Sequence, residues 1–319
     1  MNKYNQLTLK ERYQIKAFLE INLSHSEIAR RLSRNKSNIS REIKRNRGPG
    51  KYDPEAAQRR YEDKKKNSIK CKRVTFEMKE IIKEKIELDW SPEQIVGHCK
   101  KIGIKMVSFK TIYTYIKKDR ENGGTLYKHL RHTKKRRKKY GSKEIRGQLR
   151  NRVSIEERPE CANNRKRLGD WEADLIIGKN HKGVIVTLVE RLTGVLIMDY
   201  VESKNANKVA DKIISLLAPF TPYVQTITFD NGKEFARHEK IAKDLKAKMY
   251  FAHPYSSWER GTNENTNGLV RQYFPKKSNF EKISEKGIAK VISRLNLRPR
   301  KRLGFASPAE AFAERCSRW

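Results

Sequence analysis

The sequence predicts a multidomain chain whose front half is all-α and whose back half is an α/β domain. Residues 6–118 contain short helical patterns that begin at capping signals, whereas from residue 168 apolar strand patterns alternate with helical ones. A third observation concerns the partner. The 319 residues include 73 Lys and Arg against 37 Asp and Glu, and the resulting formal charge of +36 favours binding to a polyanion.

The positive charge is concentrated in the front half. Residues 1–150 contain 42 Lys and Arg against 17 Asp and Glu, a net charge of +25, which leaves +11 for residues 151–319. Because cations that meet phosphates release condensed counterions, nucleic acid is the expected partner. The sequence has no run of 18 apolar residues, no apolar signal segment and no C-x-x-C pair. A cytoplasmic, nucleoid-associated protein without a membrane span or a zinc module is therefore expected.

The first unit has the pattern of a helix-turn-helix. Capping boxes at Thr8–Glu11 and Ser24–Glu27 open two helices, and a third, basic helix is expected over Lys36–Arg45 with Ile39 and Ile43 facing inward. A helix that enters the major groove needs short polar side chains and Arg or Asn near its start. The expected DNA contacts are Ser37, Asn38, Ser40, Arg41 and Lys44. The alternative is the solvated face of an ordinary three-helix bundle.

Residues 75–118 repeat the three-helix pattern. Ser91–Gln94 supplies an N-cap, a proline at the first helical position and a capping-box glutamine. The last helix begins at Ser108, and Lys110 within it is assigned as a further DNA contact. Because this helix is more apolar than its counterpart in the first unit, a structural or dimerisation role is the alternative.

Two basic segments separate these units from each other and from the back half. Gly48–Gly50 followed by Lys64–Lys66 predicts a turn and then a basic helix or tether. The run Lys134–Lys139 predicts a linker that follows DNA phosphates or, alternatively, a solvated tail between domains.

The back half has the element order of a ribonuclease-H-like, retroviral-integrase-like α/β fold. That order is three antiparallel strands, a helix, a parallel strand, a helix and a final strand followed by a helix. The expected strands are residues 170–178, 184–189, 195–201, 224–229 and 248–251, and the main expected helices are residues 206–217, 264–274 and 283–295.

Three acidic residues lie where such a fold would bring them together. Asp174 is in the first strand, Asp230 ends the fourth, and Glu264 begins a later helix after 33 intervening residues. Gathered carboxylates repel one another unless cations lie between them. Two Mg²⁺ ions about 3.5–4 Å apart, or Mn²⁺ in their place, would stabilise the attacking and leaving oxygens of a phosphodiester displacement. Strand alternation puts Asp170 and Glu172 on the same face as Asp174, so the choice of the first acid stays open.

Each acid also has a simpler interpretation. Asp230 precedes Asn231 and Gly232 and is typical of a turn, and Glu264 is typical of a helix start, where the dipole favours a negative charge. Trp171 points to the opposite face of its strand and is expected in the core.

Several blocks of the sequence resemble the DDE transposases of the insertion-sequence-thirty family. Three blocks resemble it closely, Trp171–Gly178, Phe229–Phe235 and Ala252–Asn265, of which Trp258–Asn265 is the most specific part. Further likeness lies in Ile39–Ile43, Arg271–Pro275 and Leu297–Phe305. One departure is Ala173, where such proteins often have glycine. The resemblance implies that Asp174, Asp230 and Glu264 are the catalytic, metal-binding triad.

The resemblance also implies a function. Such a transposase binds the terminal inverted repeats of its own element, frees 3′-hydroxyls and joins them to target DNA, so the partners would be double-stranded DNA and further copies of the chain. Arg271, Arg298 and Arg300 are interpreted as phosphate or backbone contacts. The competing functions are a helix-turn-helix repressor without catalysis and a metal-dependent, structure-selective nuclease.

The expected division of the chain follows from these patterns. It comprises a helix-turn-helix domain at 1–47, a basic linker at 48–74, a second helix-turn-helix-like unit at 75–118, a basic linker at 119–167 and a catalytic domain with C-terminal helices at 168–319.

Overall fold

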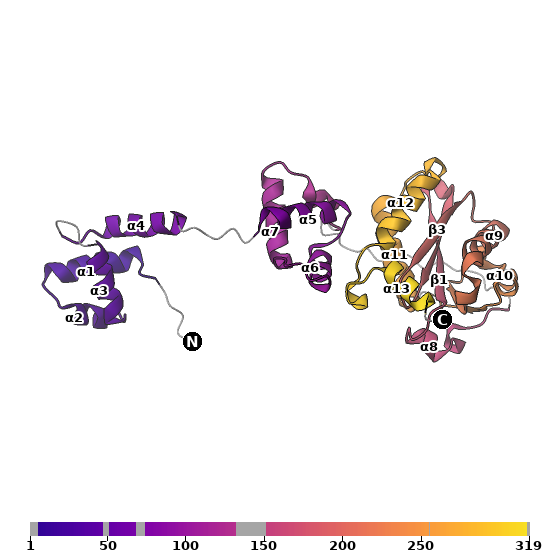
Figure 1. Cartoon of the computed structure of the whole chain (residues 1–319), viewed down its shortest axis with the longest axis horizontal. Helices are drawn as coiled ribbons and strands as arrows, with labels where there is room; N and C mark the ends of the chain where they lie inside the picture. The colour runs from indigo at the N-terminus through magenta and orange to yellow at the C-terminus, as the bar shows by residue number, and fades with distance from the viewer. Residues whose placement is uncertain (1–5, 47–50, 68–73, 132–150, 255, 318–319) are drawn as a thin grey trace. The chain divides into compact units, whose positions relative to one another are not determined.

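The computed structural model describes residues 6–46, 51–67, 74–131, 151–254 and 256–317. The chain forms two compact units, Met1–Arg73 and Val74–Trp319, which are described separately (Figure 1). None of the helices in these described ranges has the length and apolar composition that crossing a bilayer requires.

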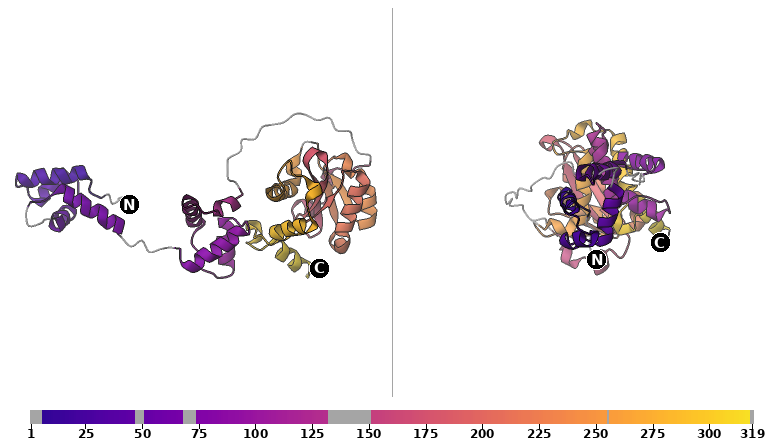
Figure 2. Two further views of the ribbon diagram at one scale, coloured as in Figure 1. Left: turned by 90° about the horizontal axis from the view of Figure 1, so that it is seen from above. Right: turned by 90° about the vertical axis from the view of Figure 1, so that its left-hand side faces the viewer.

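The first unit is a small bundle of helices, seen from a second direction in Figure 2. Its helices are α1 (Leu9–Glu20), α2 (His25–Arg31), α3 (Lys36–Asn46) and α4 (Pro54–Asn67). At α1 the predicted capping box is present, with Thr8 and Glu11 each accepting from the other's backbone N–H. At α2 the Ser24 hydroxyl caps the helix, but the Glu27 carboxylate accepts from Arg30 and Arg31.

Helix α4 lies in the segment that the charge pattern predicted to be a basic linker. Tyr52 and Ala57 are buried in the same core as Ile15, Ile28 and Ile39. The segment therefore completes the first bundle. The charged residues around these two apolar positions had concealed this role in the sequence.

The larger unit begins with a second three-helix arrangement. It consists of α5 (Phe76–Glu87), α6 (Pro92–Lys101), α7 (Phe109–Glu121) and the short η1 (Leu126–His129). The predicted capping box of Ser91 and Gln94 opens α6. Fully buried isoleucines from all three helices form the core, together with Leu126 of η1.

The second part of this unit contains a five-stranded mixed sheet. The strands are β1 (Asp170–Ile177), β2 (Val184–Glu190), β3 (Leu196–Val201), β4 (Thr226–Phe229) and β5 (Lys248–Phe251), in the order β3-β2-β1-β4-β5. The pairs β1–β2 and β2–β3 are antiparallel, whereas β1–β4 and β4–β5 are parallel. The predicted ribonuclease-H-like strand order is therefore confirmed.

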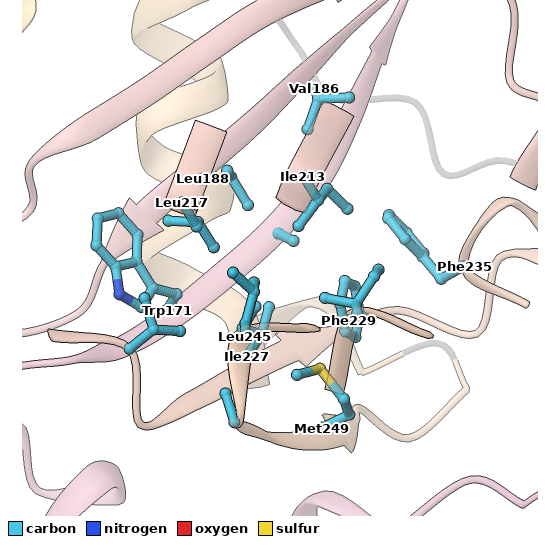
Figure 3. Packing of buried hydrophobic residues seen from close by; sticks show 14 of the residues in the cluster. Trp171, Val186, Leu188, Ile213, Leu217, Ile227, Phe229, Phe235, Leu245 and Met249 are labelled. Atoms are coloured by element: carbon cyan, nitrogen blue, oxygen red, sulfur yellow. The ribbon is translucent and has the colours of Figure 1, made fainter. Parts of the chain in front are cut away.

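Helices cover both faces of the sheet (Figure 1). One face packs against α9 (Ala206–Leu217) and α10 (His238–Leu245), and the other against α11 (Gly261–Tyr273) and α12 (Glu285–Asn296). Trp171 lies in the core beneath α9 and α10, as predicted (Figure 3). Because side chains alternate along a strand, Asp170, Glu172 and Asp174 lie on the α11 face.

Shorter elements complete the unit. They are η2 (Ile155–Glu157), α8 (Glu160–Asn163), η3 (Lys179–His181), η4 (Ala218–Tyr223), η5 (Lys233–Phe235), η6 (Ser257–Arg260), η7 (Phe280–Lys282), η8 (Lys301–Leu303) and α13 (Pro308–Cys316). Part of the second predicted linker packs on the sheet, since Ser154 bridges to Phe251 and Ile155 is buried. The basic run Lys134–Lys139 lies outside the described residues.

The helices around α6 contact the C-terminal helices of the same unit. Asp89 accepts hydrogen bonds from His129 at 2.9 Å and from the Tyr273 hydroxyl at 2.7 Å, and it pairs with Arg294. Gln94 donates to the carbonyl of Pro299 at 2.8 Å. Burial raises the pKa of Asp89, but these three donors outweigh it and hold that pKa below its ordinary value.

Candidate active site and DNA-contact residues

The parallel pairing of β1 and β4 brings the first two predicted acids together. Glu172 lies opposite Thr228 in this register, and two residues further along each strand are Asp174 and Asp230. Both carboxyl groups therefore lie on the α11 face of the sheet, beyond the carboxyl end of β4. Each side chain is 25% exposed, so the pair is open to solvent and ions.

One arginine joins the two acids. Arg260 ends η6, and its Nη1 lies 3.6 Å from Asp174 Oδ1 while its Nη2 lies 3.6 Å from Asp230 Oδ2. Nη1 also donates to the carbonyl of Ala173 at 3.1 Å. Arg260 lies within the family-like block Ala252–Asn265, but nothing in the sequence alone marked it as a site residue.

Asp174 is held in a fixed orientation. Its Oδ2 accepts from Asn267 Nδ2 at 2.8 Å, and its Oδ1 accepts from the Leu175 N–H at 2.9 Å. Burial raises the pKa of Asp174; the charge of Arg260 lowers it and the neighbouring Asp230 raises it, so that the net shift is upward. The site therefore disfavours two uncompensated negative charges.

Glu264 lies in the first turn of α11 and is exposed. It is three residues before Asn267, which donates to Asp174, so the Glu264 and Asn267 side chains are neighbours on the surface of α11. Within the described ranges, no three His, Cys, Asp or Glu side chains are close enough to hold a metal ion together. The structure thus brings Asp174 and Asp230 together and places Glu264 on the adjoining helix.

The other two acids of β1 are buried and form ion pairs away from the Asp174–Asp230 pair. Asp170 is fully buried, pairs with Arg167 and accepts from Thr226 Oγ1 at 2.7 Å. Glu172 is fully buried and pairs with Arg191. Among these three acids, Asp174 alone faces Asp230 with part of its side chain exposed.

Buried polar groups fix the start of α11 against the sheet. The Asn263 N–H donates to Glu172 Oε2 at 2.8 Å. Thr187 on β2 donates toward Asn263 and Asn267 at 3.3 and 3.0 Å. Asn263 precedes the third acid directly within the family-like block Ala252–Asn265, whereas nothing in the sequence marked Asn267 apart from its spacing of three from Glu264.

Helix α3 presents the predicted DNA contacts of the first unit. Ser37, Arg41 and Lys44 are exposed, and Asn38 and Ser40 are half-buried. Arg41 is held by its own helix, with Nε donating to the Ser37 carbonyl at 2.9 Å and Nη2 to Asn38 Oδ1 at 3.3 Å. A hollow of about 70 Å³ beside it is lined by Gln6, Leu7, Arg34, Asn38, Arg41, Glu42 and Arg45. A small, arginine-rich hollow of this kind suits a phosphate or a base edge.

The cations predicted in the larger unit differ in exposure. Lys110 on α7 is exposed. Arg271 donates to the carbonyl of Ile177 at 3.0 Å, Arg298 is 3% exposed and donates to the Tyr273 hydroxyl, and Arg300 donates to the Leu295 carbonyl. Burial, with Arg298 and Arg302 nearby, lowers the pKa of Arg300 to about 10. A role of these three arginines in DNA binding stays a prediction, because in this structure each guanidinium donates a hydrogen bond to an oxygen of the protein itself.

Comparison with known proteins agrees with these features. A family described as "Helix-turn-helix domain" matches residues 3–46. The chain is 44% identical to the transposase for insertion sequence element IS4351 of Bacteroides fragilis, over 97% of this chain and 95% of that one. It is 37% identical to transposase InsI for insertion sequence element IS30A of Escherichia coli K12, over 95% of this chain and 82% of that one. Among solved structures, the catalytic core domain of BIV integrase matches 46% of this chain and 93% of its own, at 23% identity and a TM-score of 0.36.

These full-length relatives define a class, the transposases of bacterial insertion sequences. Within that class the chain belongs to the IS30 family, the insertion-sequence-thirty family that its motifs resemble. The predicted function as a DDE transposase is confirmed at this level, over the repressor and the nuclease.

Proposed function

We propose that this transposase holds divalent metal at Asp174, Asp230 and Glu264, and there cleaves and joins DNA at the ends of its own element. The observation that carries the proposal is the pair of part-exposed carboxylates, Asp174 and Asp230, that both face Arg260. Such a pair attracts positive charge, and carboxylate oxygens are the ligands that Mg²⁺ prefers. Asp174 and Asp230 therefore fit divalent metal, and Glu264 on the adjoining helix would complete a ligand set for two Mg²⁺ ions, or Mn²⁺ in their place.

The metal would supply activation of the attacking oxygen and stabilisation of the leaving oxygen. The chain's own residues prepare the site for this. Asn267 and the Leu175 N–H orient the Asp174 carboxylate. Glu172 and Thr187 fix the first turn of α11, which sets where Glu264 can reach. No side chain needs to act as a nucleophile, because water attacks in the first step and a DNA 3′-hydroxyl in the second.

The DNA partner would be held chiefly by the helical units. We assign Ser37, Asn38, Ser40, Arg41 and Lys44 on α3 to the terminal inverted repeats, supported by the helix-turn-helix match and by the exposure of three of these side chains, Ser37, Arg41 and Lys44. Lys110 on α7 extends the contact, and target DNA would be engaged by the catalytic part. Synapsis of two ends calls for a homo-oligomer on DNA in the cytoplasm, at the nucleoid.

The test is a cleavage and joining assay on DNA that carries the element end. Purified chain with Mg²⁺ should give cut ends and strand-transfer products. Glu264→Gln should retain end binding and lower both products by at least about 100-fold, as expected for a group that acts in the transition state. Glu285→Gln is the matched control, because it also removes an acid from the first turn of a helix in the same unit.

Two outcomes would contradict the proposal. If the protein only hydrolyses DNA and never joins strands, it acts as a nuclease. If Glu264→Gln cleaves and joins as well as the Glu285→Gln control, Glu264 is not part of the catalytic site.

A further inference from the structure

Arg260 makes contacts that differ from those of a structural arginine. Arg191, fully engaged, pairs with Glu172 and donates to the carbonyls of Ala162 and Asn163. Arg260 instead stands 3.6 Å from each of its two carboxylates, beyond ordinary hydrogen-bond length. Its Nε is buried and has no hydrogen-bond partner among the described residues.

This geometry means that charge, more than hydrogen bonding, holds Arg260 in place. The side chain is only 12% exposed, so the guanidinium has given up most of its water. Among the described residues it makes one hydrogen bond of ordinary length, to the carbonyl of Ala173. A buried Nε without an acceptor is costly, and such groups are rare in stable cores. Arg260 therefore compensates the charge of two acids, while few hydrogen bonds oppose its displacement from them.

We propose that Arg260 is a built-in counter-cation that holds Asp174 and Asp230 together before metal binds and is displaced from them by the metal. The inference rests on the proposed metal centre and goes beyond it, because it assigns a positioning role to a residue outside the acid triad. The physical reason is mutual exclusion: the carboxylate oxygens that face the guanidinium are those that a divalent ion needs.

Two consequences follow from this exchange. Without metal, removing the guanidinium leaves two carboxylates facing each other, which lowers the stability of the metal-free protein. With metal, removing the guanidinium removes its competitor, which raises metal affinity. A purely structural arginine would show the first effect without the second.

The experiment measures Mn²⁺ affinity by electron paramagnetic resonance on the full-length chain without DNA. Arg260→Gln should bind Mn²⁺ about 5- to 150-fold more tightly than the unmodified chain, the usual range for coupling between two binding events. Arg260→Lys keeps the charge and should stay close to the unmodified chain. Arg165→Gln is the matched control, because Arg165 also packs on α11, donating to Thr262 Oγ1 at 2.9 Å, and no contact with the acid pair is seen among the described residues.

The outcomes separate the two proposals. Unchanged or weaker Mn²⁺ binding by Arg260→Gln, with binding still abolished by Asp174→Asn, overturns the counter-cation and leaves the metal centre standing. Mn²⁺ binding that is insensitive to Asp174→Asn overturns the metal centre, and the counter-cation with it.

A second measurement covers the case in which Arg260→Gln does not fold. In the unmodified chain, the Nε–H resonance of Arg260, assigned by its loss in Arg260→Lys, should shift when Mg²⁺ is added. A resonance that does not move while Mg²⁺ binds at the acids would overturn the exchange.

Discussion

Glu172→Gln is the sharpest test of how the fold supports the site. Glu172 is fully buried between Arg191, whose side chain is 6% exposed, and the N–H of Asn263. The substitution keeps the volume of the side chain but removes the charge, leaving the Arg191 guanidinium buried without its counter-ion. It also turns an acceptor into a mixed donor and acceptor beside two donors.

The expected cost can be worked from these contacts. Removing one partner of a buried ion pair typically costs about 3–5 kcal/mol, whereas an exposed pair contributes little. Arg191 retains its bonds to the carbonyls of Ala162 and Asn163, so we expect a loss near the lower end, about 3 kcal/mol. Glu202→Gln is the control, because Glu202 pairs with Lys208 at the surface and its loss should leave stability unchanged.

Tryptophan fluorescence during urea unfolding is a suitable assay. All four tryptophans lie beyond residue 73, so the signal reports the larger unit and not the first bundle. Glu172→Gln should lower the urea midpoint and leave the slope of the transition unchanged. A midpoint equal to that of Glu202→Gln would refute the reasoning that this buried pair stabilises the sheet domain.

Three further predictions concern packing, charge and DNA. Gly97→Ala puts a methyl group 2.2 Å from Phe305 Cε1 and should destabilise the protein, since overpacking costs about 1–3 kcal/mol. In a Phe305→Ala background the same substitution should stabilise it by about 0.5–1 kcal/mol, because alanine favours the helix more than glycine does. The same sign of change in both backgrounds would refute the contact. Burial raises the pKa of Asp174, so ionisation of this carboxyl lowers the stability of the fold as the pH rises from about 4 through that pKa. Without metal, Asp174→Asn should therefore be more stable than the unmodified chain at neutral pH, with a smaller gain near about pH 3. An equal gain at both pH values would contradict this. Arg41→Ala should weaken binding to the element end by about 1–3 kcal/mol, and equal weakening on unrelated DNA would make Arg41 a phosphate contact.

Sequence reasoning succeeded where local pattern and tertiary structure agree. The five strands show either alternating apolar and polar residues or continuous apolar runs, as buried strands do, and their order followed from their spacing. The parallel register of β1 and β4 then brings Asp174 beside Asp230 without any further information. The same alternation left Asp170 and Glu172 as candidates, and only their burial and their ion pairs with Arg167 and Arg191 exclude them from the open site.

Sequence reasoning was weakest for the cationic side chains. A buried arginine and a phosphate-binding arginine look alike in a sequence, because the difference lies in which oxygens they meet. Arg298 and Arg260 show this, since one is buried under Tyr273 and the other faces two acids. The core role of the α4 segment was obscured for a related reason, because Tyr52 just before the helix and Ala57 within it are surrounded by charged residues.

Helix α11 is fastened at both ends by acids that belong to other elements. At one end, Glu172 of the sheet accepts a hydrogen bond from the N–H of Asn263. At the other end, Asp89 of the α5–α6 connection accepts one from the hydroxyl of Tyr273. Because α11 is held at both ends, it cannot tilt at one end without straining the contact at the other. The reach of Glu264 toward the acid pair is thus set jointly by the sheet below it and by the α5–α6 connection, whose Asp89 lies 184 residues before Tyr273 in the chain.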